Sequence, residues 1–313
     1  MENNIFVTGV TGCIGHYVIR ELKRSFPNAH LHMMVRNKKK FKINIDDWSN
    51  VTIHSGDMDD ISTCKEVLKT VDYIVHIATV WGYNLDVNIR INRDRTLEMF
   101  DYCDPSRLKK IIYFSTASIL TDNNELSPAA KTDGSPYIKS KLEAYNAIKS
   151  SVWEDRVITL FPTMVLGGAD DAPYSHISQG LLDIRKHLRW AKWLHLNGSF
   201  HFLHAEDIAK MVSISMLQDV PKDMVMGNPK MTFNEAILEL AETIGKKPLV
   251  QFNIPQWLIN TVLFIFKGRV DSWGAHCARH PYFQYNVHAP YHFGEELSFS
   301  SLKAVVEKMK IND

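Results

Sequence analysis

Residues 5–15 read IFVTGVTGCIG, and this stretch decides the fold because an apolar run leads through a glycine-rich turn into an amphipathic segment. In such a turn Gly9 permits the tight bend, Gly12 lets the backbone approach a pyrophosphate, and Gly15 allows close contact between helix and strand. Free N–H groups at the start of the helix then bind phosphates. We therefore expect a dinucleotide site, with a plain turn as the alternative. Its expected residues are Gly9, Gly12, Cys13, Ile14 and Gly15.

Short apolar runs recur through the first half of the chain and alternate with amphipathic stretches. The runs that we expect to form buried strands are Ile5–Thr8, Leu31–Val35, Val51–His54, Tyr73–Ile77, Lys110–Phe114 and Val157–Leu160. The stretches that we expect to form helices lie near 14–25, 60–69, 89–103 and 135–150. Strands that alternate with helices through short loops are typical of a parallel sheet covered on both faces. The sequence therefore predicts an α/β fold, a doubly wound parallel sheet of the Rossmann type.

The pattern changes after about residue 166, where helical periodicity takes over at 175–190, 205–218, 232–244 and 255–267. We expect a dinucleotide-binding domain over 1–166, to which 200–228 returns. The remaining segments, 167–199 and 229–313, would form a smaller, mainly helical substrate lobe. The stretch 255–267 is apolar on most sides, and we expect its own lobe to cover it, with a membrane surface or a partner subunit as the alternatives.

Composition excludes several classes of protein. The 313 residues carry 36 Lys and Arg against 35 Asp and Glu, which is far from the balance of a dedicated nucleic-acid binder. Four cysteines lie far apart without a C-x-x-C pair, so we expect a reducing, cytoplasmic location. The apolar run Leu258–Phe266 is about half the length that spans a bilayer, and no integral membrane segment is expected.

Histidines and a cysteine near the end of the chain have spacings that zinc sites use. Cys277 stands three residues before His280, and His288 stands four residues before His292. Neutral histidines among aromatic residues are nonetheless common in packed lobes. We therefore expect no metal site.

The second predicted strand ends in Arg36, at the position where an acidic residue usually accepts hydrogen bonds from the ribose 2′-OH of NAD. A guanidinium at this position suits a 2′-phosphate, which it can bind with two charge-assisted hydrogen bonds. We therefore expect NADP(H), with NAD(H) as the alternative. Lys38, Lys39, Lys40 and Lys42 follow, and we interpret these lysines as a solvated loop.

Residues 135–141 read SPYIKSK and resemble a helix start, with Ser135 as the N-cap and Pro136 in the first turn. Tyr137 and Lys141 are four residues apart and so share one helix face. A free tyrosine has a pKa of about 10, and a nearby cation favours its phenolate form. The pair can therefore move a proton to or from a substrate oxygen, whereas the alternative is two surface neighbours.

Residues 114–118 read FSTAS and place several hydroxyls at the carboxyl end of a predicted strand. Doubly wound sheets bind their ligands at this edge, so a hydroxyl here would hold the substrate oxygen, whereas a turn hydroxyl is the alternative. Trp81 follows the fourth predicted strand. We expect its ring to face the substrate beside the nicotinamide.

Together these motifs resemble the extended short-chain dehydrogenases/reductases, also called the NAD-dependent epimerase/dehydratase family, over nearly the whole chain. The matching motifs, in order, are TGVTGCIG at 8–15, Gly56-Asp57, His76-Ile77-Ala78, Asn92 with Thr96, FSTAS at 114–118, Tyr137 with Lys141, Pro162-Thr163-Met164-Val165, and His204-Ala205-Glu206-Asp207.

The resemblance implies roles for individual residues. Tyr137 would be the general acid or base, Lys141 would hold the nicotinamide ribose and lower the tyrosine pKa, and Thr116 would orient the substrate oxygen, with Ser115 the weaker candidate. The cofactor contacts that the resemblance implies are Asp57 and Met58 at the adenine, Ala78 along the pyrophosphate and ribose, Pro162 and Val165 beside the nicotinamide, and Asn92 behind the cofactor loops.

Two departures from the family pattern bear on the substrate. Sugar-nucleotide epimerases of the family usually carry an arginine where this chain has Phe161, and a Tyr-Gly pair where it has Leu120-Thr121. Both departures weaken the prediction of a nucleotide-sugar substrate. Arg36 together with PTMVLGG at 162–168 resembles the branch that includes the dihydroflavonol and cinnamoyl-CoA reductases, which act on apolar or aromatic carbonyls.

The function expected from the sequence is therefore an NADP-dependent oxidoreductase that acts on a carbonyl or alcohol. An epimerase or dehydratase, which uses hydride transfer transiently, is the first alternative, and a nucleotide-sensing regulator is the second. The expected partner is a small-molecule substrate, and the sequence is also compatible with a homodimer.

Overall fold

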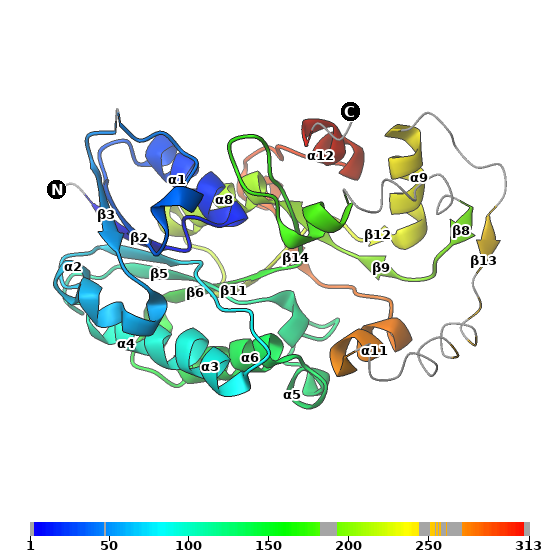
Figure 1. Ribbon diagram of the computed structural model, residues 1–313, viewed down its shortest axis with the longest axis horizontal. Helices are drawn as coiled ribbons and strands as arrows, with labels where there is room; N and C mark the ends of the chain where they lie inside the picture. The colour runs from blue at the N-terminus through cyan, green and yellow to red at the C-terminus, as the bar shows by residue number, and fades with distance from the viewer. Residues whose placement is uncertain are drawn as a thin grey trace.

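The computed structural model describes residues 3–46, 48–181, 193–243, 251–253, 255, 257, 261 and 271–309. At its centre lies an eight-stranded sheet of order β14-β11-β6-β5-β4-β1-β2-β3, in which every neighbouring pair is parallel (Figure 1). Its strands are β1 Asn4–Thr8, β2 His30–Val35, β3 Val51–Ser55, β4 Tyr73–His76, β5 Lys110–Phe114, β6 Val157–Pro162, β11 Asp223–Met226 and β14 Val287–His288. The predicted fold class is confirmed, and the six predicted strands are each found within two residues of their expected ends.

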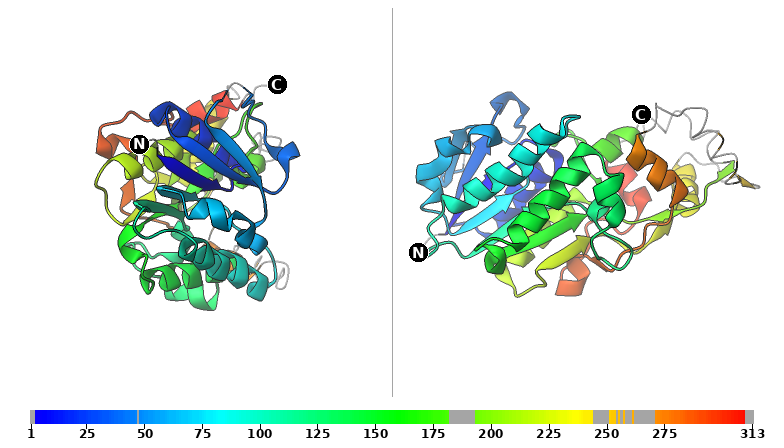
Figure 2. Two further views of the ribbon diagram at one scale, coloured as in Figure 1. Left: turned by 90° about the vertical axis from the view of Figure 1, so that its left-hand side faces the viewer. Right: turned by 90° about the horizontal axis from the view of Figure 1, so that it is seen from below.

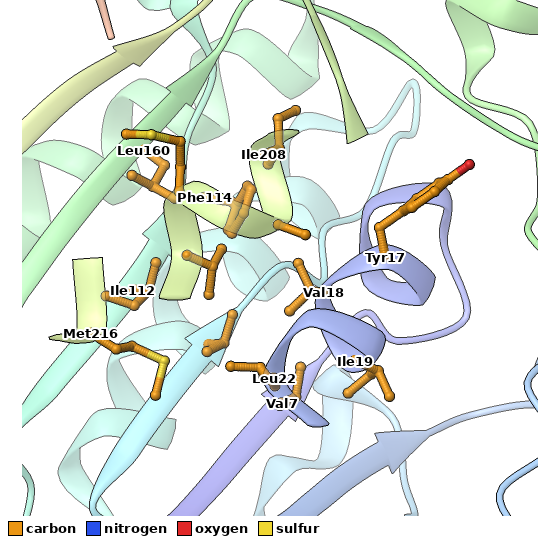
Figure 3. Close-up of a cluster of buried hydrophobic side chains, with 14 of the residues drawn as sticks. Val7, Tyr17, Val18, Ile19, Leu22, Ile112, Phe114, Leu160, Ile208 and Met216 are labelled. Carbon is orange, nitrogen blue, oxygen red and sulfur yellow. The ribbon is translucent and has the colours of Figure 1, made fainter. Parts of the chain in front are cut away.

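Helices cover both faces of this sheet. On one face, α1 (Cys13–Ser25) packs against α8 (Ala205–Leu217). Figure 3 shows Val18 and Leu22 of α1 beside Ile208 of α8 and Ile112 of β5, all fully buried or nearly so. The two faces of the strands are both buried, which explains why the strand sequences are almost continuously apolar.

The opposite face carries α2 (Lys65–Leu68), α3 (Leu85–Ile89), α4 (Arg95–Asp101) and α6 (Pro136–Lys149), and Figure 2 shows α3, α4 and α6 lying across the sheet in its view from below. Two predicted helices are built differently from the expectation. The stretch 60–69 contains a 3₁₀ segment, η2 (Met58–Cys64), before α2, because Asp60 has non-helical angles. The stretch 89–103 contains a π-helical turn, η3 (Arg90–Asp94), between α3 and α4.

Short strands and helices beyond residue 163 build a smaller cluster beside the sheet. The strand pairs are β7 (Met164–Leu166) with β10 (Phe202–His204), β9 (Ser199–Phe200) with β12 (Met231–Thr232), and β8 (Leu194–His195) with β13 (Phe252–Asn253). Its helices are α9 (Phe233–Thr243), α11 (Ser272–Arg279) and α12 (Leu302–Lys308), and α9 packs on α12 through Ala236, Leu302 and Val306. The remaining elements are η1 (Lys38–Lys40), η4 (Ala117–Ile119), α5 (Pro128–Thr132), η5 (Glu154–Arg156) and η6 (Pro290–Phe293).

Two predicted helices of this part extend beyond what the structure describes. The helix expected at 175–190 is described only as far as residue 181, and most of 255–267 lies outside the described residues. Within the described ranges, none of the helices is long and apolar enough to cross a bilayer. The four cysteines carry free thiols.

Candidate active site

A cavity of about 1610 Å³ opens at the carboxyl ends of the central strands. Ligands of doubly wound sheets bind at this edge, and the volume exceeds the 300–1,000 Å³ that is usual for one small ligand. Every site residue predicted from the sequence lines this cavity except Asn92, which lies behind its wall.

The glycine loop after β1 has the shape that a pyrophosphate requires. Gly9 has a φ of +75°, and a Cβ there would lie 2.6 Å from the backbone nitrogen of Ala78. A Cβ on Gly15 would lie 2.2 Å from the carbonyl oxygen of Gly9, so side chains are excluded at both positions. At Gly12, by contrast, the nearest atom would be 3.4 Å away, and this residue faces the cavity. Helix α1 begins there without a side-chain cap or an acidic residue in its first turn, which leaves its N–H groups free for an anion.

A basic loop closes one end of the cavity beside this glycine loop. Arg36 is exposed and forms an ion pair of 3.2 Å with Asp57. Lys39, Lys40 and Lys42 are exposed, as expected of a solvated loop, but they also line the cavity. Four cationic side chains, those of Arg36, Lys39, Lys40 and Lys42, therefore line the cavity.

His16, whose role the sequence did not reveal, joins the glycine loop to the basic loop. Its side chain is fully buried on α1. The backbone N–H of Lys42 donates to Nε2 at 3.1 Å, so Nδ1 carries the proton that it donates to the carbonyl oxygen of Gly12, 2.9 Å away. Burial lowers the pKa of His16, which keeps the ring neutral and suited to this bridge.

Tyr137 and Lys141 lie one turn apart at the start of α6, where Ser135 accepts a hydrogen bond from the backbone of Ile138 and Pro136 occupies the first turn. Lys141 is 2% exposed, and its Nζ donates to the carbonyl oxygen of Phe114 at 2.7 Å. Burial lowers the pKa of Lys141 to about 7. Burial also raises the pKa of Tyr137, and a hydrogen bond with Thr116 offsets part of that increase, so the phenol holds its proton at neutral pH.

The two hydroxyls at the end of β5 differ in their partners. Thr116 lies near enough to Tyr137 to lower the pKa of its phenol, and its Oγ1 accepts from the backbone N–H of Ser118 at 3.3 Å. The hydroxyl of Ser115 is buried in the cavity wall and has no hydrogen-bond partner among the described residues. Thr116 is therefore the hydroxyl that stands beside the phenol.

A chain of buried hydrogen bonds holds this helix against the cofactor loops. In the π-helical turn η3, Asn92 accepts from the backbone N–H of Val80 at 2.9 Å and donates to Ser140 at 2.9 Å. Ser140 in turn donates to the carbonyl oxygen of Tyr137 at 2.8 Å. Asn92 thus joins the loop after β4 to Ser140, which in turn holds the tyrosine backbone.

His76 extends this chain to β1, and the sequence showed it only as part of a motif. Its Nδ1 lies 2.8 Å from the hydroxyl of Thr8, and its Nε2 lies 3.0 Å from the hydroxyl of Thr96. The Thr8 oxygen also accepts from the backbone N–H of Ala78 at 3.1 Å. Burial lowers the pKa of His76 to about 3, so the ring stays neutral between its two partners.

Trp81 lies beside the phenol, where the sequence placed a substrate contact. Its indole stacks on the Tyr137 ring with centroids 4.0 Å apart and planes 12° apart. Cys277 lines the same cavity, whereas His288 and His292 lie beside one another, with ring centroids 6.1 Å apart. In the part of the chain that the structure describes, no three His, Cys, Asp or Glu side chains converge as metal ligands would.

Comparisons with known proteins agree with this geometry. The sequence model of the NAD dependent epimerase/dehydratase family matches residues 5–227. The decarboxylating sterol-4-alpha-carboxylate 3-dehydrogenase of Saccharomyces cerevisiae is 25% identical over 166 residues, which cover 50% of this chain and 46% of that enzyme. The match thus spans about half the length of the yeast enzyme.

Solved structures share the fold at low sequence identity. The dTDP-glucose 4,6-dehydratase of Bacillus anthracis, in complex with NAD, has a TM-score of 0.65 at 15% identity, covering 99% of this chain and 96% of that one. The UDP-N-acetylglucosamine 4-epimerase of Methanobrevibacter ruminantium, in complex with UDP-N-acetylmuramic acid, has a TM-score of 0.68 at 17% identity, covering 100% and 99%.

Proposed function

The chain belongs to the NAD dependent epimerase/dehydratase family of enzymes, and we propose that it is an NADP(H)-dependent oxidoreductase that interconverts a carbonyl and an alcohol. The observation that carries this proposal is the meeting of Tyr137, Thr116 and Lys141 in one cavity with a glycine loop built for a dinucleotide. When bound, the nicotinamide supplies or accepts the hydride.

Tyr137 is the general acid in the reducing direction. Its phenol is protonated at neutral pH because burial raises its pKa, so a proton is available for the oxygen of a carbonyl. Thr116 would hold that oxygen beside the phenol, since its hydroxyl lines the same cavity and lowers the pKa of Tyr137. In the oxidising direction the same phenol must lose its proton, and the ammonium form of Lys141 favours that loss.

The cofactor that fits the basic loop is NADP(H). Arg36 and the three cavity-lining lysines Lys39, Lys40 and Lys42 present positive charge to the adenosine ribose, whereas the carboxylate of Asp57 is paired with Arg36. A 2′-phosphate would replace that pairing with charge-assisted hydrogen bonds. Asp57 and Met58 would contact the adenine, Ala78 would lie along the pyrophosphate, and Pro162 and Val165 would border the nicotinamide.

An epimerase or dehydratase is the second candidate, because the family and its solved members include both activities. Such an enzyme uses the same phenol but regenerates its cofactor within each turnover. Net change in nicotinamide absorbance separates the two functions.

The test is a panel of aldehydes and ketones incubated with the purified protein and either NADPH or NADH. We expect net oxidation of NADPH with at least one carbonyl, and faster turnover than with NADH. Conversion of a sugar nucleotide without net change in absorbance would favour the epimerase. Tight binding of NADPH with no turnover of any compound would contradict both enzymes and favour a nucleotide-sensing protein.

A further inference from the structure

The part of the cavity beyond Tyr137 is built from rings. Trp81 stacks on Tyr137 with its plane 12° from the phenol, and His176 packs on Trp81 with centroids 5.4 Å apart. Despite these two contacts Trp81 is 60% exposed, so much of the indole surface remains open to a ligand. The further Phe, Tyr and Trp residues that line the cavity, all from the chain beyond residue 163, are Tyr174, Phe200, Phe233, Trp273, Phe283 and Tyr285.

Charged side chains are distributed unevenly along the same cavity. Among its described lining residues, the permanently charged side chains at the adenosine end are Arg36, Lys39, Lys40, Lys42 and Asp57, and they follow β2 and β3. Strands β1 and β4 separate β2 from β5, where the catalytic hydroxyls lie. The remaining Lys, Arg, Asp or Glu side chain in the described lining is Lys141, whose Nζ donates to the carbonyl oxygen of Phe114.

His201 adds no charge to this lining. Its Nδ1 lies 2.8 Å from the carbonyl oxygen of Asn228, and its Nε2 accepts from the backbone N–H of Tyr285 at 3.0 Å. Burial lowers the pKa of His201, which agrees with a neutral ring that uses both nitrogens. Apart from His176 and Lys141, the described lining residues around Trp81 offer no cationic partner to a diphosphate or carboxylate, and burying an unpaired anion is costly.

We propose that the substrate is an uncharged compound with a flat ring system, and that Trp81 selects it by stacking beside Tyr137. This inference rests on the proposed oxidoreductase function, because the carbonyl or alcohol of that ring system must reach the phenol. Offset or parallel contact with an aromatic face favours a planar ring over a puckered one of equal size. Trp81 is therefore a specificity-determining residue, distinct from the groups that move the proton.

The test compares 2-naphthaldehyde with its fully saturated counterpart, decahydro-2-naphthaldehyde, which has the same carbon skeleton but puckered rings. With NADPH, we expect wild type to reduce the flat aldehyde with the higher kcat/KM. Trp81→Ala should raise the KM for 2-naphthaldehyde by about fivefold to tenfold, with a smaller change for the saturated aldehyde. Trp81→Phe should restore most of the preference, and Tyr83→Ala, a fully exposed neighbour in the same loop, should leave it unchanged.

Calorimetric titration of 2-naphthaldehyde into the protein with NADP⁺ measures binding without turnover, and NADPH affinity reports whether each variant is folded. Binding of the flat aldehyde that weakens in Trp81→Ala, without reduction of either aldehyde or of any other carbonyl in the panel, would support the substrate class and contradict the oxidoreductase. Reduction of both aldehydes with equal kcat/KM in wild type and Trp81→Ala would overturn the selection by Trp81 and leave the oxidoreductase standing. Tighter binding of UDP-glucose than of 2-naphthaldehyde would overturn the uncharged substrate class.

Discussion

The Nζ of Lys141 donates a hydrogen bond of 2.7 Å to the carbonyl oxygen of Phe114, which ties the catalytic helix α6 to the end of β5. The same Nζ lies 4.9 Å from the centre of the Tyr113 ring. Neither partner is an anion, so burial of this lysine costs stability, and its pKa falls to about 7. Burial of Lys141, which we propose to act in the reaction, thus lowers the free energy of unfolding.

We therefore predict that Lys141→Met stabilises the protein while reducing turnover. The folded pKa lies below the ordinary value of 10.5, so the unfolded chain binds more protons between about pH 7 and 10.5. The stability of wild type should consequently rise with pH across that window relative to the variant. Thermal unfolding of both proteins at several pH values measures this difference in stability. The Tm of the variant should exceed that of wild type by roughly 2 °C for each kcal/mol of unfolding free energy gained. A variant less stable than wild type at pH 7 would contradict this account.

The two hydroxyls at the end of β5 should contribute unequally to turnover. Thr116→Ala removes the hydroxyl that lowers the pKa of Tyr137 and that we propose to hold the substrate oxygen, and we expect kcat to fall by about two orders of magnitude. Ser115→Ala should have a much smaller effect, and Thr116→Ser should keep most of the activity as the matched control. If Ser115→Ala were the more damaging change, the substrate oxygen would lie against Ser115 instead.

Acid should weaken the fold through the histidines of β2 and β3. The Nδ1 of His32 lies 3.1 Å from the Nε2 of His54, and His30 stacks on His32 with centroids 4.4 Å apart. Burial, together with the charges on His30 and His54, lowers the pKa of His32 from 6.5 to about 4. Since the unfolded chain takes up the proton first, stability should fall as the pH drops from about 6.5 to 4.

Urea unfolding at pH 7 and pH 5 measures this loss. His32→Gln should reduce the difference between the two pH values, whereas substitution of the exposed His280 by Gln should not. An unchanged difference in His32→Gln would assign the acid sensitivity to other groups.

Cofactor choice should depend on Arg36. We predict that wild type binds NADPH roughly ten- to hundredfold more tightly than NADH, as one charge-assisted contact allows. Arg36→Asp should erase or invert that preference, because two carboxylates would then face the 2′-phosphate. Lys38→Asp makes the same charge change on a loop residue outside the cavity lining and should have little effect. Direct titration of both cofactors into wild type and the two variants measures these affinities. Equal affinity of wild type for NADH and NADPH would mean that Arg36 makes no contact with a 2′-phosphate.

The parts of this site that follow from the sequence are those with local patterns. The glycine spacing at 9, 12 and 15 and the four-residue spacing of Tyr137 and Lys141 reflect the geometry of one turn or one helix, and the structure brings these residues into one cavity. The bridge through His16 had no such pattern, because a histidine in an amphipathic helix resembles ordinary core. It depends on where the basic loop folds back, and this tertiary contact also brings Lys42 to the cavity.

The stack of Trp81 on Tyr137 was equally inaccessible from the sequence. Trp81 comes from the loop after β4 and Tyr137 from helix α6, which follows β5, and they meet because β4 and β5 are neighbours in the sheet. The chain from Thr8 through His76 to Thr96 likewise joins three elements, each of which reads as an ordinary apolar strand or helix on its own.

The most direct test of the proposed function follows deuterium from the cofactor. Wild type and Tyr137→Phe are each incubated with 2-naphthaldehyde and the two C4-deuterated epimers of NADPH, and the alcohol is analysed by mass spectrometry. We predict that wild type transfers deuterium to the alcohol carbon from one epimer, and that Tyr137→Phe does so at least about a hundredfold more slowly while binding NADPH as tightly as wild type. Equal transfer by both proteins would contradict the role of Tyr137, and the absence of transfer to this or any other carbonyl by NADPH-bound wild type would contradict the oxidoreductase itself.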